Sequence, residues 1–244
     1  MKQTLQKLLY SSFLLLATTA CNADLDSNPN IIASIPEASG ISYCDNTDTL
    51  MVANDEGTFY EITPKGEIIT QHKLGNYDLE GVVCEKERIV FAVEGEGLLD
   101  VNRKSMEKKL LRLKGKKIKL SKKSGIEGLV KVGKHYYLSI QAKKKKDAKL
   151  LKVATTPEYA KVLKVIEHGV IDSAGLEYKG KKLYIVSDKK DKLYVYDLKR
   201  EKITKKIKLP KFAQEGIAFG KHGDVFFADD NGAVMKYTLK ELGL

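Results

Sequence analysis

The chain has 244 residues, of which 43% are apolar, and carries a formal net charge of +11 that comes mostly from lysine. This length suits a single domain with a full-sized core. The interleaving of basic and aromatic residues that is typical of nucleic-acid-binding surfaces is absent, so we expect no nucleic-acid partner. Lysines scattered through predicted loops keep a β-protein soluble and protect its strand edges. The alternative is attraction to an anionic partner such as lipid headgroups.

Residues 1–20 have the features of a secretory signal. Two lysines precede an apolar stretch, residues 8–17, which is followed by small residues. This stretch is too short for a bilayer-spanning helix, which needs about 20 residues. Cys21, directly after the small residues, indicates a lipoprotein, in which this cysteine is lipidated and anchors the chain firmly to a membrane. The alternative is ordinary cleavage after Ala20, which would release a periplasmic protein.

Residues 21–29 are polar and predict a short tether, which leaves residues 30–244 for the folded domain. A short pattern recurs five times in this domain: a small or acidic residue, then glycine, then an aliphatic residue. Its members are Ser39-Gly40-Ile41, Glu80-Gly81-Val82, Glu127-Gly128-Leu129, Ala174-Gly175-Leu176 and Glu215-Gly216-Ile217. The glycines are 41, 47, 47 and 41 residues apart. A recurrence of this length with strand-like content is typical of radial β-repeats.

Each recurrence begins a series of short apolar runs separated by turn-forming residues. The expected strands are 39–44, 50–54, 58–63 and 68–74 in the first unit; 80–84, 88–93, 97–102 and 110–120 in the second; 127–132, 135–140, 149–153 and 162–167 in the third; 175–178, 182–187, 192–197 and 203–209 in the fourth; and 215–219, 224–228 and 233–238 in the fifth. This pattern predicts an all-β fold, a five-bladed β-propeller. A β-sandwich, the all-β alternative, has no fixed long period, and an α/β fold is disfavoured because long helical patterns are missing.

The fifth unit is one strand short, which would leave an unpaired edge where the ring closes. An extra apolar segment, residues 30–35, precedes the first unit. We therefore expect this N-terminal strand to complete the last blade and to join the two ends of the chain.

Three acidic residues, Glu80, Glu127 and Glu215, occupy the position before the repeated glycine. The first strand of each propeller blade lines the central channel, so these carboxylates are expected to converge there. Carboxylates held together repel, and they either take up a proton or bind a cation. Oxygen ligands favour a hard cation, Ca²⁺ first. The alternative is that the glutamates face a wet channel mouth and contact only water and lysine.

Other acids accompany this position. The fourth unit has Ala174 before its glycine, with Asp172 two residues earlier and Glu177 three residues later. Asp188 and Asp229 follow second strands, where Asp commonly stabilises a turn. Turn capping is therefore the first interpretation of these two residues, and a ligand-facing rim is the alternative.

Two cysteines, Cys44 and Cys84, lie at similar points of neighbouring units. An exported protein can form a disulfide bond, but inner strands of adjacent blades often stand too far apart for disulfide geometry. Two buried thiols are the favoured interpretation, and a disulfide bond stays open.

Four segments carry a resemblance to a known family: Asp78-Leu79-Glu80, Ile126-Glu127-Gly128-Leu129, Asp172-Ser173-Ala174-Gly175-Leu176-Glu177 and Gln214-Glu215-Gly216-Ile217-Ala218. In these segments the chain resembles the SdiA-regulated family of bacterial envelope proteins, over roughly residues 32–240. The resemblance implies a five-bladed propeller with a bound calcium ion, and the matching acidic positions are Glu80, Glu127, Glu177 and Glu215. It implies no reaction, because the family name records regulation.

We therefore expect a monomeric, Ca²⁺-binding propeller in the bacterial cell envelope, which binds a small ligand or an envelope protein. The lipid on Cys21 would hold it on a membrane, facing the periplasm. The alternative is a Ca²⁺-dependent hydrolase of lactones or phosphoesters, in which the cation polarises an ester or phosphate oxygen. The sequence contains no nucleophile elbow, phosphate loop or Cys-x-x-Cys motif, so it predicts no catalytic residue.

Overall fold

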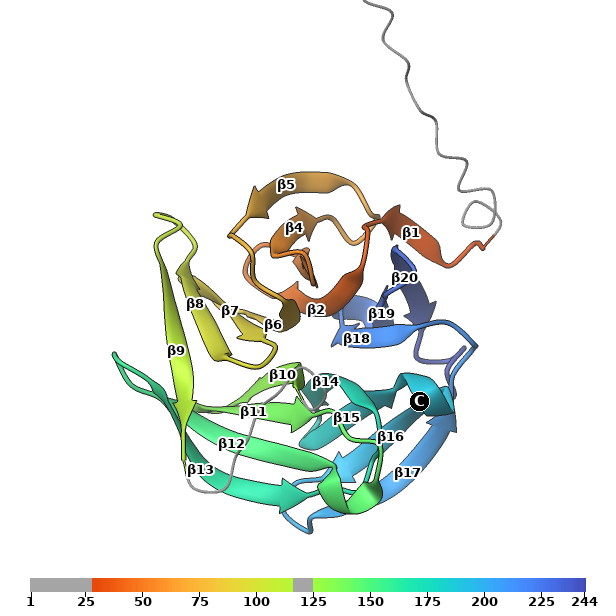
Figure 1. Cartoon of the computed structure of the whole chain (residues 1–244). Coiled ribbons are helices and arrows are strands. Elements are labelled where there is room, and N and C mark those ends of the chain that lie inside the picture. The colour runs from red at the N-terminus through yellow and green to blue at the C-terminus, as the bar shows by residue number, and fades with distance from the viewer. Residues whose placement is uncertain (1–27, 116–124) are drawn as a thin grey trace, which may run out of the picture.

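The computed structural model describes residues 28–115 and 125–244, and the regular structure in these ranges is almost entirely β-strand (Figure 1). The predicted all-β fold is confirmed. The signal at residues 1–20, the lipidation site Cys21 and all but the last two residues of the tether lie outside the described residues, so these expectations stay predictions. Within the described ranges, no helix is long and apolar enough to cross a membrane.

The strands form antiparallel meanders that follow the sequence units. The first is β2 (Ala38–Cys44), β3 (Thr49–Asn54), β4 (Thr58–Ile62) and β5 (Ile68–Lys73); the second is β6 (Leu79–Cys84), β7 (Arg88–Val93), β8 (Gly97–Asn102) and β9 (Lys108–Lys114); the third is β10 (Ile126–Val132), β11 (His135–Ile140), β12 (Lys149–Thr155) and β13 (Ala160–Glu167). The fourth is β14 (Ser173–Lys179), β15 (Lys182–Ser187), β16 (Lys192–Asp197) and β17 (Lys202–Lys208); the last is β18 (Gln214–Phe219), β19 (Asp224–Asp229) and β20 (Ala233–Thr238). Single 3-10 turns occur at Lys145–Asp147, Asp188–Lys190 and Lys221–Gly223.

The N-terminal strand β1 (Ile31–Ser34) pairs with β20, as the sequence predicts. It becomes the outer strand of a four-stranded sheet in the order β1-β20-β19-β18. Ile35, which follows β1, is fully buried, and its backbone N–H donates to the carbonyl of Gly232 at 3.1 Å. The beginning and the end of the domain are therefore held in one sheet.

The first strands of the meanders contact one another in a closed series: β2 contacts β6, then β10, β14 and β18 follow in turn, and β18 returns to β2. A Cβ atom at Gly175 would lie 2.9 Å from the carbonyl oxygen of Glu215, and one at Gly216 would lie 2.9 Å from the backbone nitrogen of Ile41. The glycines of the other three recurrences approach the next first strand even more closely. Any side chain would overlap the neighbouring backbone, which explains why glycine recurs at this position.

A disulfide bond joins Cys44, at the end of β2, to Cys84, at the end of β6. The favoured interpretation of two free thiols is therefore wrong. The close contact of β2 with β6 at Gly40 brings the two Cα atoms to 5.4 Å, within the range that a disulfide requires. With a sequence separation of 40 residues, the bond should stabilise the fold by about 4 kcal/mol, chiefly by restricting the unfolded chain.

The second and third meanders are joined through their outer strands into one eight-stranded sheet, which the sequence does not predict. β9 runs parallel to the start of β13 and pairs with it at two places, Leu113 with Ala160 and Lys114 with Lys161. The strand predicted over residues 110–120 begins earlier, at Lys108, and is described as far as Lys114. Residues 116–120 of that prediction lie outside the described residues.

Burial decreases from the inner strands to the outer strands. All six residues of β3 are buried, whereas most of β5 and β17 is exposed. Apolar side chains of neighbouring meanders pack together between the sheets; one such cluster includes Val90 of β7 and Leu138 of β11. The core is thus divided among the spaces between sheets.

Deleting residues 30–35 should lower the melting temperature by about 10 °C. The deletion removes the β1–β20 pairing and the buried side chain of Ile35. A loss of about 3–5 kcal/mol is expected for such a buried contact, and each kcal/mol shifts the melting temperature of a domain this size by about 2–4 °C. A deletion of equal length in the tether, residues 22–27, is the control and should leave the melt unchanged. An unaltered melt after the first deletion would contradict the role of β1.

Candidate functional site

Glu80, Glu127 and Glu215 lie at the starts of β6, β10 and β18, each directly before its repeated glycine. The close packing of the first strands brings the three carboxyl groups within electrostatic reach of one another. Glu127 and Glu215 both raise the pKa of Glu80, and Glu127 also raises the pKa of Glu215. The structure therefore brings together these three of the predicted metal ligands.

All three carboxyl groups hold protons more strongly than a glutamate in water. Burial is the largest cause, and the negative charges of neighbouring acids add to it. The pKa of Glu127 rises to about 7, and the pKa values of Glu80 and Glu215 are raised well above the ordinary range. Glu80 donates a hydrogen bond to Glu127, which favours the ionised form of Glu127 and lowers its pKa. At neutral pH the cluster thus shares protons instead of carrying three full charges.

More carboxylates surround these glutamates, and they fall at two further repeat positions. Three of them lie three residues before a repeated glycine: Glu37, Asp78 and Asp172. The other four directly follow a second strand: Asp55, Glu94, Asp188 and Asp230. Asp78 and Glu94 raise the pKa of Glu80 and Glu127, whereas Asp188 and Asp230 raise the pKa of Glu215. We call these seven residues, together with Glu80, Glu127 and Glu215, the acidic mouth.

Part of the acidic mouth is hollowed. Glu37, Asp55 and Asp78 line a depression of about 320 Å³ together with Asn76 and Tyr77. Burial and a hydrogen bond to Glu37 raise the pKa of Asp55 to about 7. Raised pKa values therefore extend from the three central glutamates to the side of the mouth.

The rim residues predicted from the sequence take different roles. Asp172 and Asp188 both belong to the acidic mouth, since each raises the pKa of Glu215. Asp229 instead stabilises a turn, because its Oδ1 accepts hydrogen bonds from the backbone N–H groups of Ala213 at 3.2 Å and Asn231 at 3.0 Å. The interpretation as a turn-forming residue thus fits Asp229.

The sequence interpretation of the site missed Asp78, Glu94 and Asp230, which act on the central glutamates. Acids recur after the second strands in the sequence, at Asp55, Glu94, Asp188 and the pair Asp229-Asp230, but turn capping is the favoured sequence interpretation of that position. Each acid, taken alone, is an ordinary turn residue.

Glu177 lies apart from the other three predicted ligands. It faces a separate hollow of about 200 Å³, lined also by Ser42, Asp45 and Glu85. The backbone N–H of Tyr178 donates to Glu177 at 2.6 Å, and burial raises the pKa of Glu177 to about 7. Glu177 follows Ala174 by three residues, which corresponds to about 10 Å along a strand. The fourth unit therefore contributes to the acidic mouth through Asp172 and Asp188.

The chemistry of the acidic mouth suits a hard cation, because its donors are carboxylate oxygens. In the described residues, however, no three His, Cys, Asp or Glu side chains are grouped so that they could hold a metal ion as they stand. The donor types of the acidic mouth nevertheless fit Ca²⁺.

Solved structures with the same kind of fold include enzymes. The glutaminyl cyclase of Myxococcus xanthus superposes with a TM-score of 0.65 at 14% sequence identity, over 84% of this chain and 91% of that chain. A luciferin-regenerating enzyme superposes with a TM-score of 0.52 at 16% identity, over 85% of this chain and 74% of that one. At these identities the likeness concerns the fold, which is propeller-like.

The sequence comparisons are more specific. No curated protein matches the chain. The model of the family described as SdiA-regulated matches residues 17–230, which is most of the sequence and includes the whole acidic mouth. The chain therefore belongs to the SdiA-regulated family.

Proposed function

We propose that this protein is a five-bladed β-propeller that binds Ca²⁺ in its acidic mouth and acts as a ligand- or protein-binding module of the bacterial envelope. The closed series of first-strand contacts and the glycine at each contact support the count of five blades. The observation on which the cation proposal depends is the mutual effect of Glu80, Glu127 and Glu215 on their pKa values. Three carboxyl groups so close together are stable only with protons or a cation among them.

In this proposal the cation replaces the shared protons. Glu80, Glu127 and Glu215 would turn their carboxylates towards it, with Asp172 as the fourth unit's contribution. The surrounding acids of the mouth would attract the cation from solution. Lipid on Cys21 would keep the propeller on the membrane, and a small ligand or an envelope protein would approach the loops around the mouth. We expect the propeller to act as a monomer.

Without Ca²⁺, the stability of the protein should fall as the pH rises from 6.5 to 8.5. A carboxyl group whose pKa is raised by folding stabilises the fold below its unfolded pKa, and this contribution is lost as the pH passes the folded pKa, here about 7 for Glu127. Within this window a group whose folded pKa is about 7 should lose about 1 kcal/mol, and Glu80 and Glu215, whose pKa values are also raised, should add to the loss. The window starts at 6.5 because buried His168, whose pKa is lowered to about 4, has the opposite effect below that pH.

Urea unfolding at a series of pH values measures this dependence. The Glu80/Glu127/Glu215→Gln triple variant should lose most of it, whereas Glu177→Gln should remove only the share of Glu177, whose pKa is also about 7. A free energy of unfolding that stays level or rises over this window in the unmodified chain would contradict the protonated cluster.

Ca²⁺ should stabilise the protein at pH 8. A ligand at about 100 times its dissociation constant adds about 2.7 kcal/mol, which raises the melting temperature of a domain this size by about 5–10 °C. The Glu80/Glu127/Glu215→Gln variant should show no shift, and Glu177→Gln should keep it. Anomalous scattering from a Ca²⁺-soaked crystal would locate the ion. An equal rise in melting temperature in the triple variant would show that the cation binds at another site. No rise in the unmodified chain would contradict the proposal.

A hydrolase that acts on lactones or phosphoesters is the second candidate. It is supported by Glu127, whose pKa of about 7 and hydrogen bond from Glu80 suit a general base at neutral pH. We expect any such turnover to rise with pH through about 7 and to be lost in Glu127→Gln, while Glu177→Gln keeps it. A panel of lactone, ester and phosphoester substrates tests this candidate. Absence of turnover on the panel, or turnover that survives Glu127→Gln, would reject it.

A further inference from the structure

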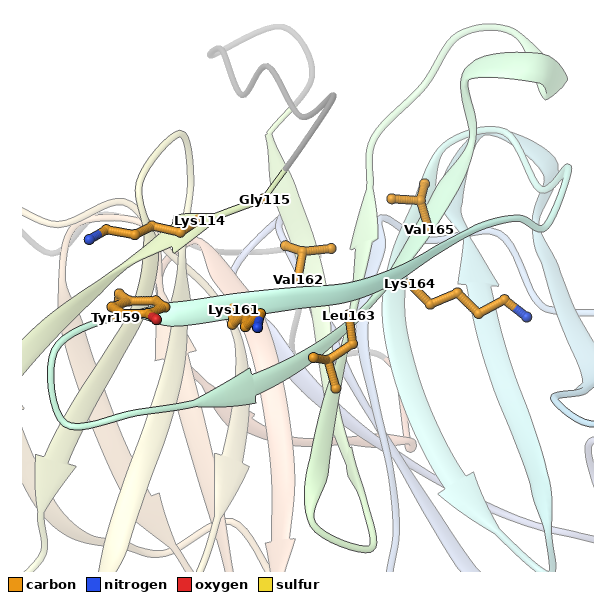
Figure 2. A pocket seen from close by; sticks show the side chains of 8 residues that line it. All are labelled: Lys114, Gly115, Tyr159, Lys161, Val162, Leu163, Lys164 and Val165. Carbon is orange, nitrogen blue, oxygen red and sulfur yellow. The ribbon is translucent and has the colours of Figure 1, made fainter.

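A groove of about 560 Å³ lies on the outside of the eight-stranded sheet, where β9 and β13 separate. Figure 2 shows its lining residues. Lys114 is the last residue of β9 and Gly115 comes next, whereas Tyr159 precedes β13 and residues 161–165 belong to it. The groove differs from the acidic mouth in composition, because it is built from outer strands and its charged residues are lysines. It needs an explanation of its own.

Within the described ranges, the edge of β13 along this groove is paired only at its start. Its other edge pairs with β12 from Ala160 to Glu167. On the groove side it pairs with β9 at Ala160 and Lys161, and beyond Lys161 no further strand of the described residues pairs with this edge. Backbone N–H and C=O groups on such an edge are available to an added strand. The two pairs with β9 demonstrate that this edge accepts a strand.

The side chains beside this edge are unusually apolar for an outer strand. Leu163 is 46% exposed and Val165 is 38% exposed, and they are two of the four large apolar residues that stand exposed in the described part of the chain. A bulge explains the arrangement, since Val162 and Lys164 pair with consecutive residues of β12 and Leu163 is left as the extra residue. Val162 and Val165 therefore point to the same side of β13 (Figure 2).

The groove is also positively charged. Lys114, Lys161 and Lys164 line it, and no Asp or Glu does. The ammonium group of Lys114 lies 4.4 Å from the ring centroid of Tyr159, and Lys164 forms an ion pair with Glu201 on the next meander. A segment that enters the groove thus meets apolar surface between lysines, along a strand edge.

We propose that this groove docks an extended segment of a protein partner in which acidic and apolar side chains alternate. Its backbone would add to the edge of β13 beyond Lys161. Its apolar side chains would cover Val162 and Val165, which point to the same side of the strand, and its carboxylates would face the lysines. A membrane surface fits less well, because it is broad and supplies no backbone groups for the strand edge. The proposal is independent of the acidic mouth and of any cation there.

Peptide binding to the exported chain, residues 21–244, tests the proposal. The probe is an eight-residue peptide that alternates Glu with Val or Ile and bears a fluorophore, and a peptide with Lys in place of Glu is its matched control. We expect binding of the acidic peptide in the micromolar range, seen as fluorescence anisotropy, and slower amide hydrogen exchange in β13. Lys114→Glu/Lys161→Glu and Val165→Asp should each weaken it at least tenfold.

Two variants outside the groove are the controls. Ile68→Asp alters an exposed apolar residue on β5, and Lys202→Glu reverses an exposed lysine on β17. Both variants should bind the acidic peptide like the unmodified chain. Equal binding by all variants, or no binding at millimolar peptide, would overturn the proposal. So would binding of phosphatidylglycerol vesicles in place of the peptide, or peptide binding that appears only after residues 116–124 are replaced by a Gly-Ser linker. In the last case this chain's own segment would be the competing occupant.

Discussion

The contact on which the structure depends is the approach of one first strand to the backbone of the next at a glycine. A side chain at Gly175 or Gly216 would meet backbone atoms at 2.9 Å, and the three earlier glycines leave even less room. Because the contact from Gly216 returns to Ile41 at the start of the first unit, the same local rule, applied repeatedly, also closes the fold. The pairing of β1 with β20 then secures this closure at the outer edge, far from the glycines. Closure is thus determined twice, by packing at the centre and by strand pairing at the outer edge.

The close approach of neighbouring first strands also has chemical consequences. At one end of β2 and β6 it brings Cys44 and Cys84 to bonding distance, so that the inner strands are also joined covalently. At the starts of the first strands it brings glutamates together that are far apart in the sequence. Burying several carboxylates in one place costs free energy unless their charge is neutralised. The raised pKa values of Glu80, Glu127 and Glu215 indicate how the protein meets this cost when no cation is present. The proposed cation site and the expected pH dependence therefore rest on the same arrangement of carboxyl groups.

Much of this could be predicted from the sequence, because it follows from periodicity. The recurrence of glycine predicted where the first strands lie, and the missing strand of the last unit predicted the role of β1. The predictions that failed depended on distances in space, which the spacing of the sequence repeat does not specify. Cys44 and Cys84 were judged too far apart because the closeness at Gly40 is a property of packing. Glu177 was grouped with the other glutamates by family resemblance, although three residues along a strand take it to another hollow. The joining of β9 to β13 has no sequence signal at all, since it involves only two residue pairs.

The distribution of charge separates the two proposed sites. The chain is strongly basic overall, yet the starts of its first strands and the turns beside them gather ten carboxyl groups into the acidic mouth. Lysines, in contrast, line the groove beside β13. An acidic segment would be repelled from the mouth and attracted to the groove, whereas a cation would experience the reverse. Since the two sites use different strands of the sheets and opposite charge, a partner bound along β13 leaves the mouth open. If both proposals hold, a cation at the acidic mouth and a protein segment along β13 can be bound at the same time.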